Sequence, residues 1–240
     1  MEWTFATVSL VIFSSAVVFG VAGFGFGLVA VPVLAILVDP AFGVIAATAL
    51  GIPLGGSIIV RDHRHISWRP VAVIVGLSLP GYPVGLIVLL VTPSRLLQLI
   101  IGVCVVVFAF VHILKIQFRL NLFGVAVGGF VSGVLATSTS MNGPPVVAAL
   151  QGLGLGPRAF RVSMAVVLFV SKLIAFAVFL LAGSVSADDA IILLSALPAC
   201  LGGVFVGDHI FSSISSRSLK RVVGFIFLAS GVVAIVKSFN

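Results

Sequence analysis

The residues best suited to chemistry form one short run of hydroxyl and amide side chains. The run consists of Thr137, Ser138, Thr139, Ser140 and Asn142, and Gly143-Pro144-Pro145 follows it. Its flanks, residues 125–136 and 146–150, carry no charge and are apolar enough to enter a lipid bilayer. Hydrocarbon tolerates polar, helix-breaking backbone only where that backbone is buried in protein or lines a wet cavity. The run therefore predicts either a substrate site within a membrane or a tight loop at its surface.

Lys172 is the one unambiguous charge deep in an apolar run, near the centre of residues 159–182. A lysine at the bilayer centre costs about 2.5–3.5 kcal/mol on insertion scales, so such residues usually face a cavity or a partner. No acidic residue is expected in mid-membrane to pair with it, because Asp39 and Asp208 lie near the ends of their runs. An unpaired cation beside a polar cavity suits an anionic substrate. The alternative is a lysine that snorkels to the interface or bonds to backbone carbonyls.

Backbone groups would supply the remaining donors of an anion site. Helix N-termini present unpaired N–H groups and a partial positive charge, and the Pro144-Pro145 pair suits the first turn of a helix that starts after Asn142-Gly143. Earlier in the chain, Gly23, Gly25 and Gly27 would let a ligand approach the backbone closely. Thr48 and Ser163 hold similar positions after these two segments and are further candidates to face the centre.

Other reactive residue types fit packing better than chemistry. Tyr82 lies between two prolines, and we expect it to pack with a satisfied hydroxyl. His63 and His65 have no carboxylate set beside them, so a solvated loop is expected instead of a metal site. Cys104 and Cys200 lie in apolar runs and favour inert packing. Because no phosphate-binding loop, nucleophile elbow or zinc-binding motif occurs, we expect neither a cofactor nor an enzyme.

The composition places these residues in a membrane protein. Of 240 residues, 61% are hydrophobic and only 8% are charged, whereas soluble domains carry about 25% charged residues. Several apolar runs near 20 residues match the thickness of a hydrocarbon core. The net charge of +7 comes from basic residues in the short loops between apolar runs. This distribution is explained better by membrane topology than by a nucleic-acid-binding surface. We predict an all-α polytopic membrane protein.

The apolar runs follow the same order twice. A long run at 4–38, broken at the glycine-rich joint 23–27, precedes spans at 41–60, 71–91 and 95–114. The third of these runs should kink at Leu79-Pro80-Gly81. A second broken run at 122–150 then precedes spans at 159–182, 190–207 and 217–237. When the two halves of the sequence are aligned, one and the same offset places Gly20 on Gly133 and Pro32 on Pro145, so the two broken runs correspond. Two broken helices at corresponding positions are the usual pointer to the substrate site of a transporter.

The loop charges set the predicted topology. If each broken run crosses the membrane once, the loop lysines and arginines divide evenly between the two sides. If each broken run crosses twice, as two short legs, the loop lysines and arginines all lie on one side except Arg95 and Lys237. The positive-inside rule prefers this second arrangement. We therefore predict two inverted repeats, 1–120 and 121–240, that form one transport domain with about 8–10 helical crossings. Both termini should then lie outside the cell.

The order of motifs resembles the sulfite exporter TauE/SafE family. The likeness rests on Gly23 to Pro32, on the segment from His65 to Arg69 after the Thr48 helix, and on Leu79-Pro80-Gly81 with Gly85. The second copy is represented by Ser132-Gly133 through Pro145 and by Arg161-Val162-Ser163. The resemblance covers nearly the whole chain and implies transport of small sulfur-containing anions, such as sulfite or organosulfonates, mostly outward across the bacterial cytoplasmic membrane. The polar run 137–142 and Lys172 depart from the pattern of many members.

Together these observations predict a secondary carrier with alternating access around a midplane site. We expect its partners to be a small anion and the lipid bilayer, with no nucleic acid; a homodimer is left open. The alternatives are a non-transporting membrane subunit and a passive anion channel. The predicted substrate-binding residues are Gly23, Gly25, Gly27, Thr48, Thr137, Ser138, Thr139, Ser140, Asn142, Ser163 and Lys172.

Overall fold

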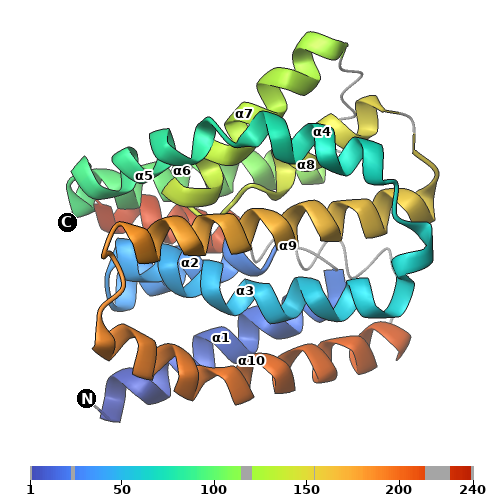
Figure 1. Cartoon of the computed structure of the whole chain (residues 1–240). Coiled ribbons are helices and arrows are strands. Elements are labelled where there is room, and N and C mark those ends of the chain that lie inside the picture. The colour runs from blue at the N-terminus through green and yellow to red at the C-terminus, as the bar shows by residue number, and fades with distance from the viewer. Residues whose placement is uncertain (1, 23–24, 115–120, 154, 214–227, 239–240) are drawn as a thin grey trace.

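The chain is built of helices packed side by side (Figure 1). The computed structural model describes residues 2–22, 25–114, 121–153, 155–213 and 228–238, and in these ranges it contains helices and no strand. The elements are α1 (Glu2–Ala22), α2 (Phe26–Leu37), α3 (Pro40–Asp62), a 3₁₀ turn (His63–His65), α4 (Trp68–Ser78), α5 (Gly81–Val91), α6 (Ser94–Ile113), α7 (Leu122–Ser138), α8 (Gly143–Gly152), α9 (Pro157–Leu181), α10 (Ala187–Ser213) and a last helix (Leu228–Ser238). The predicted all-α class is confirmed.

Several of these helices have the length and hydropathy of membrane spans. By those criteria alone, Ser94–Val111, Arg158–Leu181 and Ala187–Gly207 could each cross a bilayer within the described residues. The pair α4 and α5 would add a fourth span, bent by 45° at its centre. The bend confirms the kink predicted at Leu79-Pro80-Gly81, where proline cannot donate a helical hydrogen bond.

Polar caps and prolines start several of the helices. The Asp39 carboxylate accepts hydrogen bonds from Ala41 N at 2.8 Å and Phe42 N at 3.0 Å, which satisfies the free N–H groups at the start of α3. Asn121 caps α7 in the same way through Gly124 N at 2.9 Å. Helix α8 begins at Gly143 with proline in its first turn. These local signals fix where each chain reversal occurs.

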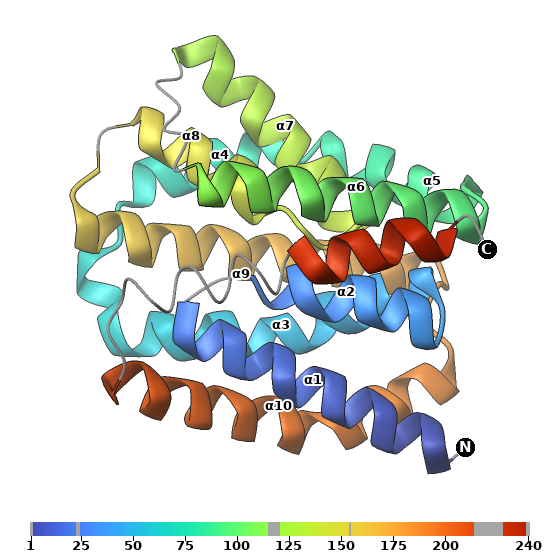
Figure 2. The same ribbon diagram turned by 180° about the vertical axis from the view of Figure 1, so that it is seen from behind.

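Each broken run turns back on itself inside the molecule. Figure 2 shows α1 running inward from the end that carries both labelled termini, while α2 returns toward that same end. Helices α7 and α8 repeat this reversal from the opposite end. Since α2 has 12 residues and α8 has 10, neither is long enough to cross a bilayer fully. Phe26 beside the first break and Ser140 at the second are buried, so both breaks lie within the helix bundle.

The two halves of the chain exchange their first helices. Helix α1 packs along α10 of the second half, and α7 packs along α4 and α5 of the first half. Each contact uses two glycines spaced four apart, Gly81 and Gly85 on α5 and Gly203 and Gly207 on α10. A Cβ atom at any of them would collide with a backbone carbonyl of the facing helix. Small residues at this spacing let helices approach closely in membrane proteins.

Corresponding helices of the two halves run in opposite directions. In Figure 1, α3 runs from left to right and α9 from right to left, and the same reversal relates the α4–α5 pair to α10. The arrangement is the one that inverted repeats produce. The boundary predicted at residue 120 falls in 115–120, outside the described residues, and stays a prediction. Helices α3 and α9 pack together at the centre, beside both chain breaks.

Candidate functional site

The two chain breaks meet at the centre of the molecule. A Cβ atom on Gly27, in the first turn of α2, would lie 2.6 Å from the carbonyl oxygen of Ser140. Only glycine allows so close an approach of two backbones. Gly25 caps α2 in the left-handed conformation (φ 92°), and Ser140 adopts it after α7 (φ 55°). Ser140 is thereby aimed away from its own helix and toward the first half of the chain.

Left-handed geometry at Ser140 follows from the way in which α7 ends. The amide of Thr139 and the amide of Met141 both donate to the Leu135 carbonyl, at 3.1 Å and 3.3 Å. A left-handed residue commonly closes a helix in this manner, usually a glycine because other side chains are strained there. A serine that bears this strain at a buried chain break is typical of functional sites.

Lys172 of α9 contacts the second chain break and helix α3. Its ammonium group donates hydrogen bonds to the Ala47 carbonyl of α3 and to Ser140 Oγ, both at 3.0 Å. The lysine stem occupies the space that a side chain would take at Gly51, where a Cβ atom would lie 2.5 Å from Lys172 Cε. Glycine at position 51 thus lets the lysine side chain pass along α3.

Ser140 connects this lysine with a second hydroxyl. Its Oγ lies 3.0 Å from Thr48 Oγ1, and Thr48 also donates to the Val44 carbonyl at 2.8 Å. Thr48 is fully buried and Ser140 is 5% exposed. An ammonium has three N–H donors, so these two acceptors leave one donor of Lys172 free within the described residues. None of the described carboxylates is paired with Lys172 there, and its charge is available to an anion.

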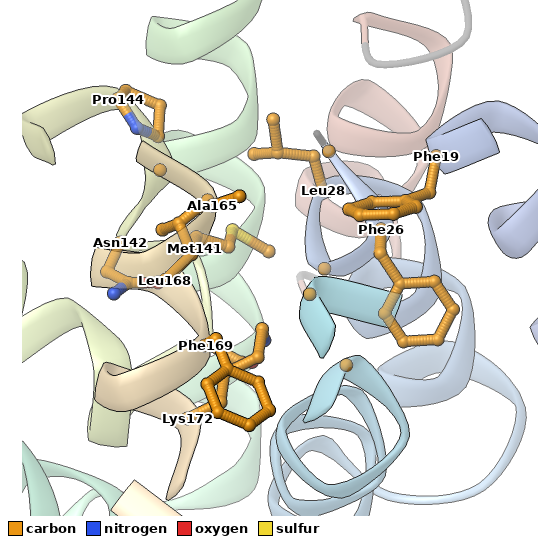
Figure 3. A pocket seen from close by; sticks show the side chains of 16 residues that line it. Phe19, Phe26, Leu28, Met141, Asn142, Pro144, Ala165, Leu168, Phe169 and Lys172 are labelled. Carbon is orange, nitrogen blue, oxygen red and sulfur yellow. The ribbon is translucent and has the colours of Figure 1, made fainter. Parts of the chain in front are cut away.

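A cavity of about 50 Å³ opens beside Lys172. One water needs about 10–15 Å³ by this measure, so the space suits a few waters or one small ion. Figure 3 shows its labelled side chains in two groups that face each other, with Phe19, Phe26 and Leu28 opposite the residues of 141–172. The wall consists of Phe19, Gly25, Phe26, Gly27, Leu28, Gly51, Gly55, Ser140, Met141, Asn142, Gly143, Pro144, Ala165, Leu168, Phe169 and Lys172.

Asn142 adds an unused donor to this wall. The residue is 2% exposed, yet its amide nitrogen has no hydrogen-bond partner among the described residues. A buried donor without a partner costs about 1–3 kcal/mol, and proteins usually satisfy such groups with protein, water or ligand. In Figure 3 this nitrogen lies on the side of Asn142 away from the facing wall, so the amide would have to turn toward the cavity to donate to a ligand there.

Five predicted site residues line the cavity together: Gly25, Gly27, Ser140, Asn142 and Lys172. Thr48 lies behind Ser140, in contact with it. Gly23 falls outside the described residues. The structure therefore brings residues of both broken runs to one place, and their part in substrate binding stays a prediction.

Three residues of the polar run lie outside the cavity wall. Thr137 Oγ1 donates to the Tyr82 carbonyl at 2.8 Å, where α7 packs on α5. Ser138 and Thr139 donate to the carbonyls four residues earlier in their own helix, at 2.8 Å and 3.1 Å. All three hydroxyls are thus occupied by backbone acceptors, and their predicted part in substrate binding stays a prediction.

Ser163 also serves a structural contact. Its Oγ accepts a hydrogen bond from Ser67 N at 3.0 Å, at the start of α4. The side chain is fully buried and does not line the cavity. The contact fixes the segment that precedes α4 against α9. Binding of substrate by Ser163 stays a prediction.

Sequence reasoning missed the apolar and glycine part of the wall. Gly51 and Gly55 face Lys172 and Phe169 on α9, a third pair of glycines spaced four apart. That spacing was available in the sequence as a sign of close helix contact. Phe26 and Met141 lie within the predicted joints and Phe19 lies just before the first, but nothing local distinguishes them from lipid-facing or core residues. Only the tertiary arrangement assigns them to the cavity.

The comparisons with known proteins settle the family. The sequence model described as "Sulfite exporter TauE/SafE" matches residues 8–234. The chain belongs to this family. No curated protein and no solved structure gives a significant match. The resemblance inferred from the motif order is confirmed, and TauE/SafE membership indicates a membrane transporter of sulfur anions.

Family membership also agrees with the coarse features of the chain. A multi-pass membrane protein is what the apolar helices and the TauE/SafE family both indicate. TauE/SafE proteins are transporters and not enzymes. Tyr82 is buried, and its hydroxyl is hydrogen-bonded to Ser78 at 3.2 Å, as predicted. Cys104 and Cys200 are free thiols, and the described residues contain no cluster of three or more metal-ligating side chains.

Proposed function

We propose that this TauE/SafE protein is a secondary carrier that exports a small sulfur-containing oxyanion, such as sulfite or an organosulfonate, across the bacterial cytoplasmic membrane. The anion would bind in the cavity between the two chain breaks, beside Lys172. The observation that carries the proposal is a lysine ammonium in the cavity wall with two neutral acceptors and no carboxylate partner among the described residues.

Neutral donors around Lys172 support binding of an oxyanion. Helices α2 and α8 both begin at the cavity, where Gly25, Phe26, Gly27 and Gly143 line the wall. The first N–H groups of α2 have no internal acceptor and carry a partial positive charge, which favours a negative ligand. At α8, Pro144 and Pro145 have no N–H, so the N–H of Gly143 and the positive end of the helix dipole remain. The Asn142 amide adds a further free donor. A sulfonate or sulfite has three oxygens that can accept from these groups.

The position of the cavity supports alternating access. One wall comes from α1, α2 and α3 and the other from α8, α9 and the break before α8. These sets belong to different halves of the chain, so a movement of one set against the other would expose the site to each side in turn. Transporters with inverted repeats commonly work in this way.

The orientation follows from the loop charges. The segment at 63–69 and the start of α9 lie at one end of the molecule and are joined by the contact of Ser67 with Ser163. They carry Arg64, Arg69, Arg158 and Arg161, and the positive-inside rule makes this end cytoplasmic. Both termini would then be periplasmic. A thiol reagent that does not cross membranes should label Ser94→Cys in intact cells and leave Arg64→Cys unlabelled.

Flux into liposomes that contain only this chain tests the function. Sulfite, thiosulfate, sulfate, sulfoacetate and taurine are offered in turn to the wild-type chain, to Lys172→Met and to Lys237→Met. Lys237 is exposed near the chain end and lies outside the cavity, so it controls for loss of a lysine elsewhere. Saturable flux that only Lys172→Met loses supports the carrier. Currents that do not saturate indicate a channel, and no flux from folded protein indicates a non-transporting subunit.

A further inference from the structure

The cavity combines a single positive charge with an apolar wall. Among its described lining residues, Lys172 is the one charged side chain, and the polar side chains beside it are Ser140 and Asn142. Phe19, Phe26 and Leu28 form the facing wall and offer no polar side-chain atom (Figure 3). Charged and polar side chains are thus confined to one side of a small space.

We infer that the site selects singly charged oxyanions over doubly charged ones and favours a head group that carries a small apolar substituent. The inference rests on the proposed function and names the substrate class of the same site. Methanesulfonate and bisulfite belong to the preferred class. Sulfate, thiosulfate, sulfoacetate and the fully deprotonated form of sulfite do not.

Charge balance excludes a second negative charge. Lys172 neutralises one charge, and the other groups that reach the cavity are hydroxyls, amides and backbone N–H groups, which are neutral. Its ammonium already shares its donors with the Ala47 carbonyl and the Ser140 hydroxyl. An uncompensated charge in a desolvated cavity is strongly unfavourable. A dianion would therefore bind more weakly than a monoanion of the same shape.

The apolar wall determines which substituent is favoured at the fourth position around the sulfur atom. A sulfonate that turns its oxygens toward Lys172 and Ser140 on one side of the cavity directs its remaining substituent toward Phe19, Phe26 and Leu28 on the other. A methyl group in that position would lose its contact with water favourably. An oxygen in the same position would meet no polar side chain, and only the neutral N–H groups at the start of α2 could replace part of its hydration. The small volume of the cavity restricts the substituent to a short one.

Methanesulfonate and sulfate form the matched pair that tests the inference. Both are tetrahedral and similar in size, and they differ by a methyl group in place of a charged oxygen. We expect the wild-type chain in liposomes to transport methanesulfonate with a Vmax/KM at least about tenfold above that for sulfate. Sulfite flux should fall as the pH rises and bisulfite loses its proton, relative to methanesulfonate flux measured at the same pH values.

A second cation should weaken the preference. Leu168 lies one turn before Lys172 on α9 and also lines the cavity. In Leu168→Lys, the ratio of methanesulfonate to sulfate transport should fall toward one, whereas Leu168→Gln, which adds polarity without charge, should keep it. If Leu168→Lys does not fold, the comparison of methanesulfonate with sulfate transport by the wild-type chain is sufficient to test the inference.

Each outcome has a distinct meaning. Flux that depends on Lys172 and favours methanesulfonate supports the inference. Flux that depends on Lys172 but carries sulfate or thiosulfate equally well overturns the inference and leaves the proposed carrier intact. If no anion gives flux that depends on Lys172, both are overturned.

Discussion

Lys172 Nζ donates a hydrogen bond to Ser140 Oγ at 3.0 Å, which joins the middle of α9 to the chain break between α7 and α8. The same ammonium bonds to Ala47 of α3. One side chain therefore ties together a long helix of the second half, a helix of the first half and a strained backbone position. An anion that competes for the ammonium would loosen these contacts, which couples binding to the packing of the two halves.

Gly27 should be essential because the two breaks touch there. In Gly27→Ala, the new Cβ atom would lie 2.6 Å from the Ser140 carbonyl, and neither backbone can yield cheaply. We expect a loss of about 1–3 kcal/mol in stability and of most transport. Thermal unfolding in detergent and flux in liposomes measure the two effects. Gly76→Ala is the matched control, since a Cβ atom there meets nothing within 4 Å; equal behaviour of both variants would contradict the account.

Gly51 should affect binding more than folding. A Cβ atom in Gly51→Ala would lie 2.5 Å from Lys172 Cε and 2.9 Å from its Nζ, but a flexible side chain can move aside. The ammonium then leaves its position beside Ser140, so we expect a folded protein with KM raised about tenfold. In Gly56→Ala the nearest atom, on Phe169, is 3.6 Å away, and KM should stay unchanged. A KM for Gly51→Ala equal to that of the wild type would argue against a role for the lysine position.

Ser163 provides a test of structural against binding roles. In Ser163→Ala, Ser67 N loses its acceptor at the start of α4. The expected result is a loss of about 1–3 kcal/mol in stability with an unchanged KM, because the residue does not line the cavity. A raised KM with unchanged stability would instead restore Ser163 as a substrate residue.

The glycine pair on α10 should hold the exchanged helices together. A Cβ atom in Gly203→Ala would lie 2.5 Å from the Phe13 carbonyl, whereas one in Gly202→Ala would lie 3.8 Å from the Phe13 ring. We expect the melting temperature to fall in Gly203→Ala and to hold or rise slightly in Gly202→Ala, since alanine favours helix over glycine. The opposite order would mean that α1 and α10 do not pack as described.

The sequence identified the features that are costly in a membrane. Lys172, the glycines near residue 25 and the run from Thr137 to Asn142 were visible because charge, flexible backbone and polar groups are rare in hydrocarbon. The kink at Pro80 and the caps at Asp39 and Asn121 were predictable since their causes are local. The same reasoning could not separate Ser140, which lines the cavity, from Thr137, which bonds to the Tyr82 carbonyl.

The contacts that build the site depend on distant parts of the chain. Lys172 and Ala47 are 125 residues apart in sequence, and Thr48 and Ser140 are 92 apart. No local pattern specifies which carbonyl or hydroxyl a buried lysine will meet. The role of Gly51 likewise depends on the facing side chain of α9. Tertiary packing of α3 against α9 decides these partners.

Anion binding to the purified protein tests the central claim most directly. Thermal unfolding in detergent is followed for the wild-type chain, Lys172→Met and Lys237→Met as methanesulfonate is added. A ligand at 100 times its Kd stabilises the state that binds it by about 2.7 kcal/mol. The account predicts a saturable rise in melting temperature for the wild type and Lys237→Met, and none for Lys172→Met. An equal rise in Lys172→Met would contradict the claim that the anion binds at Lys172.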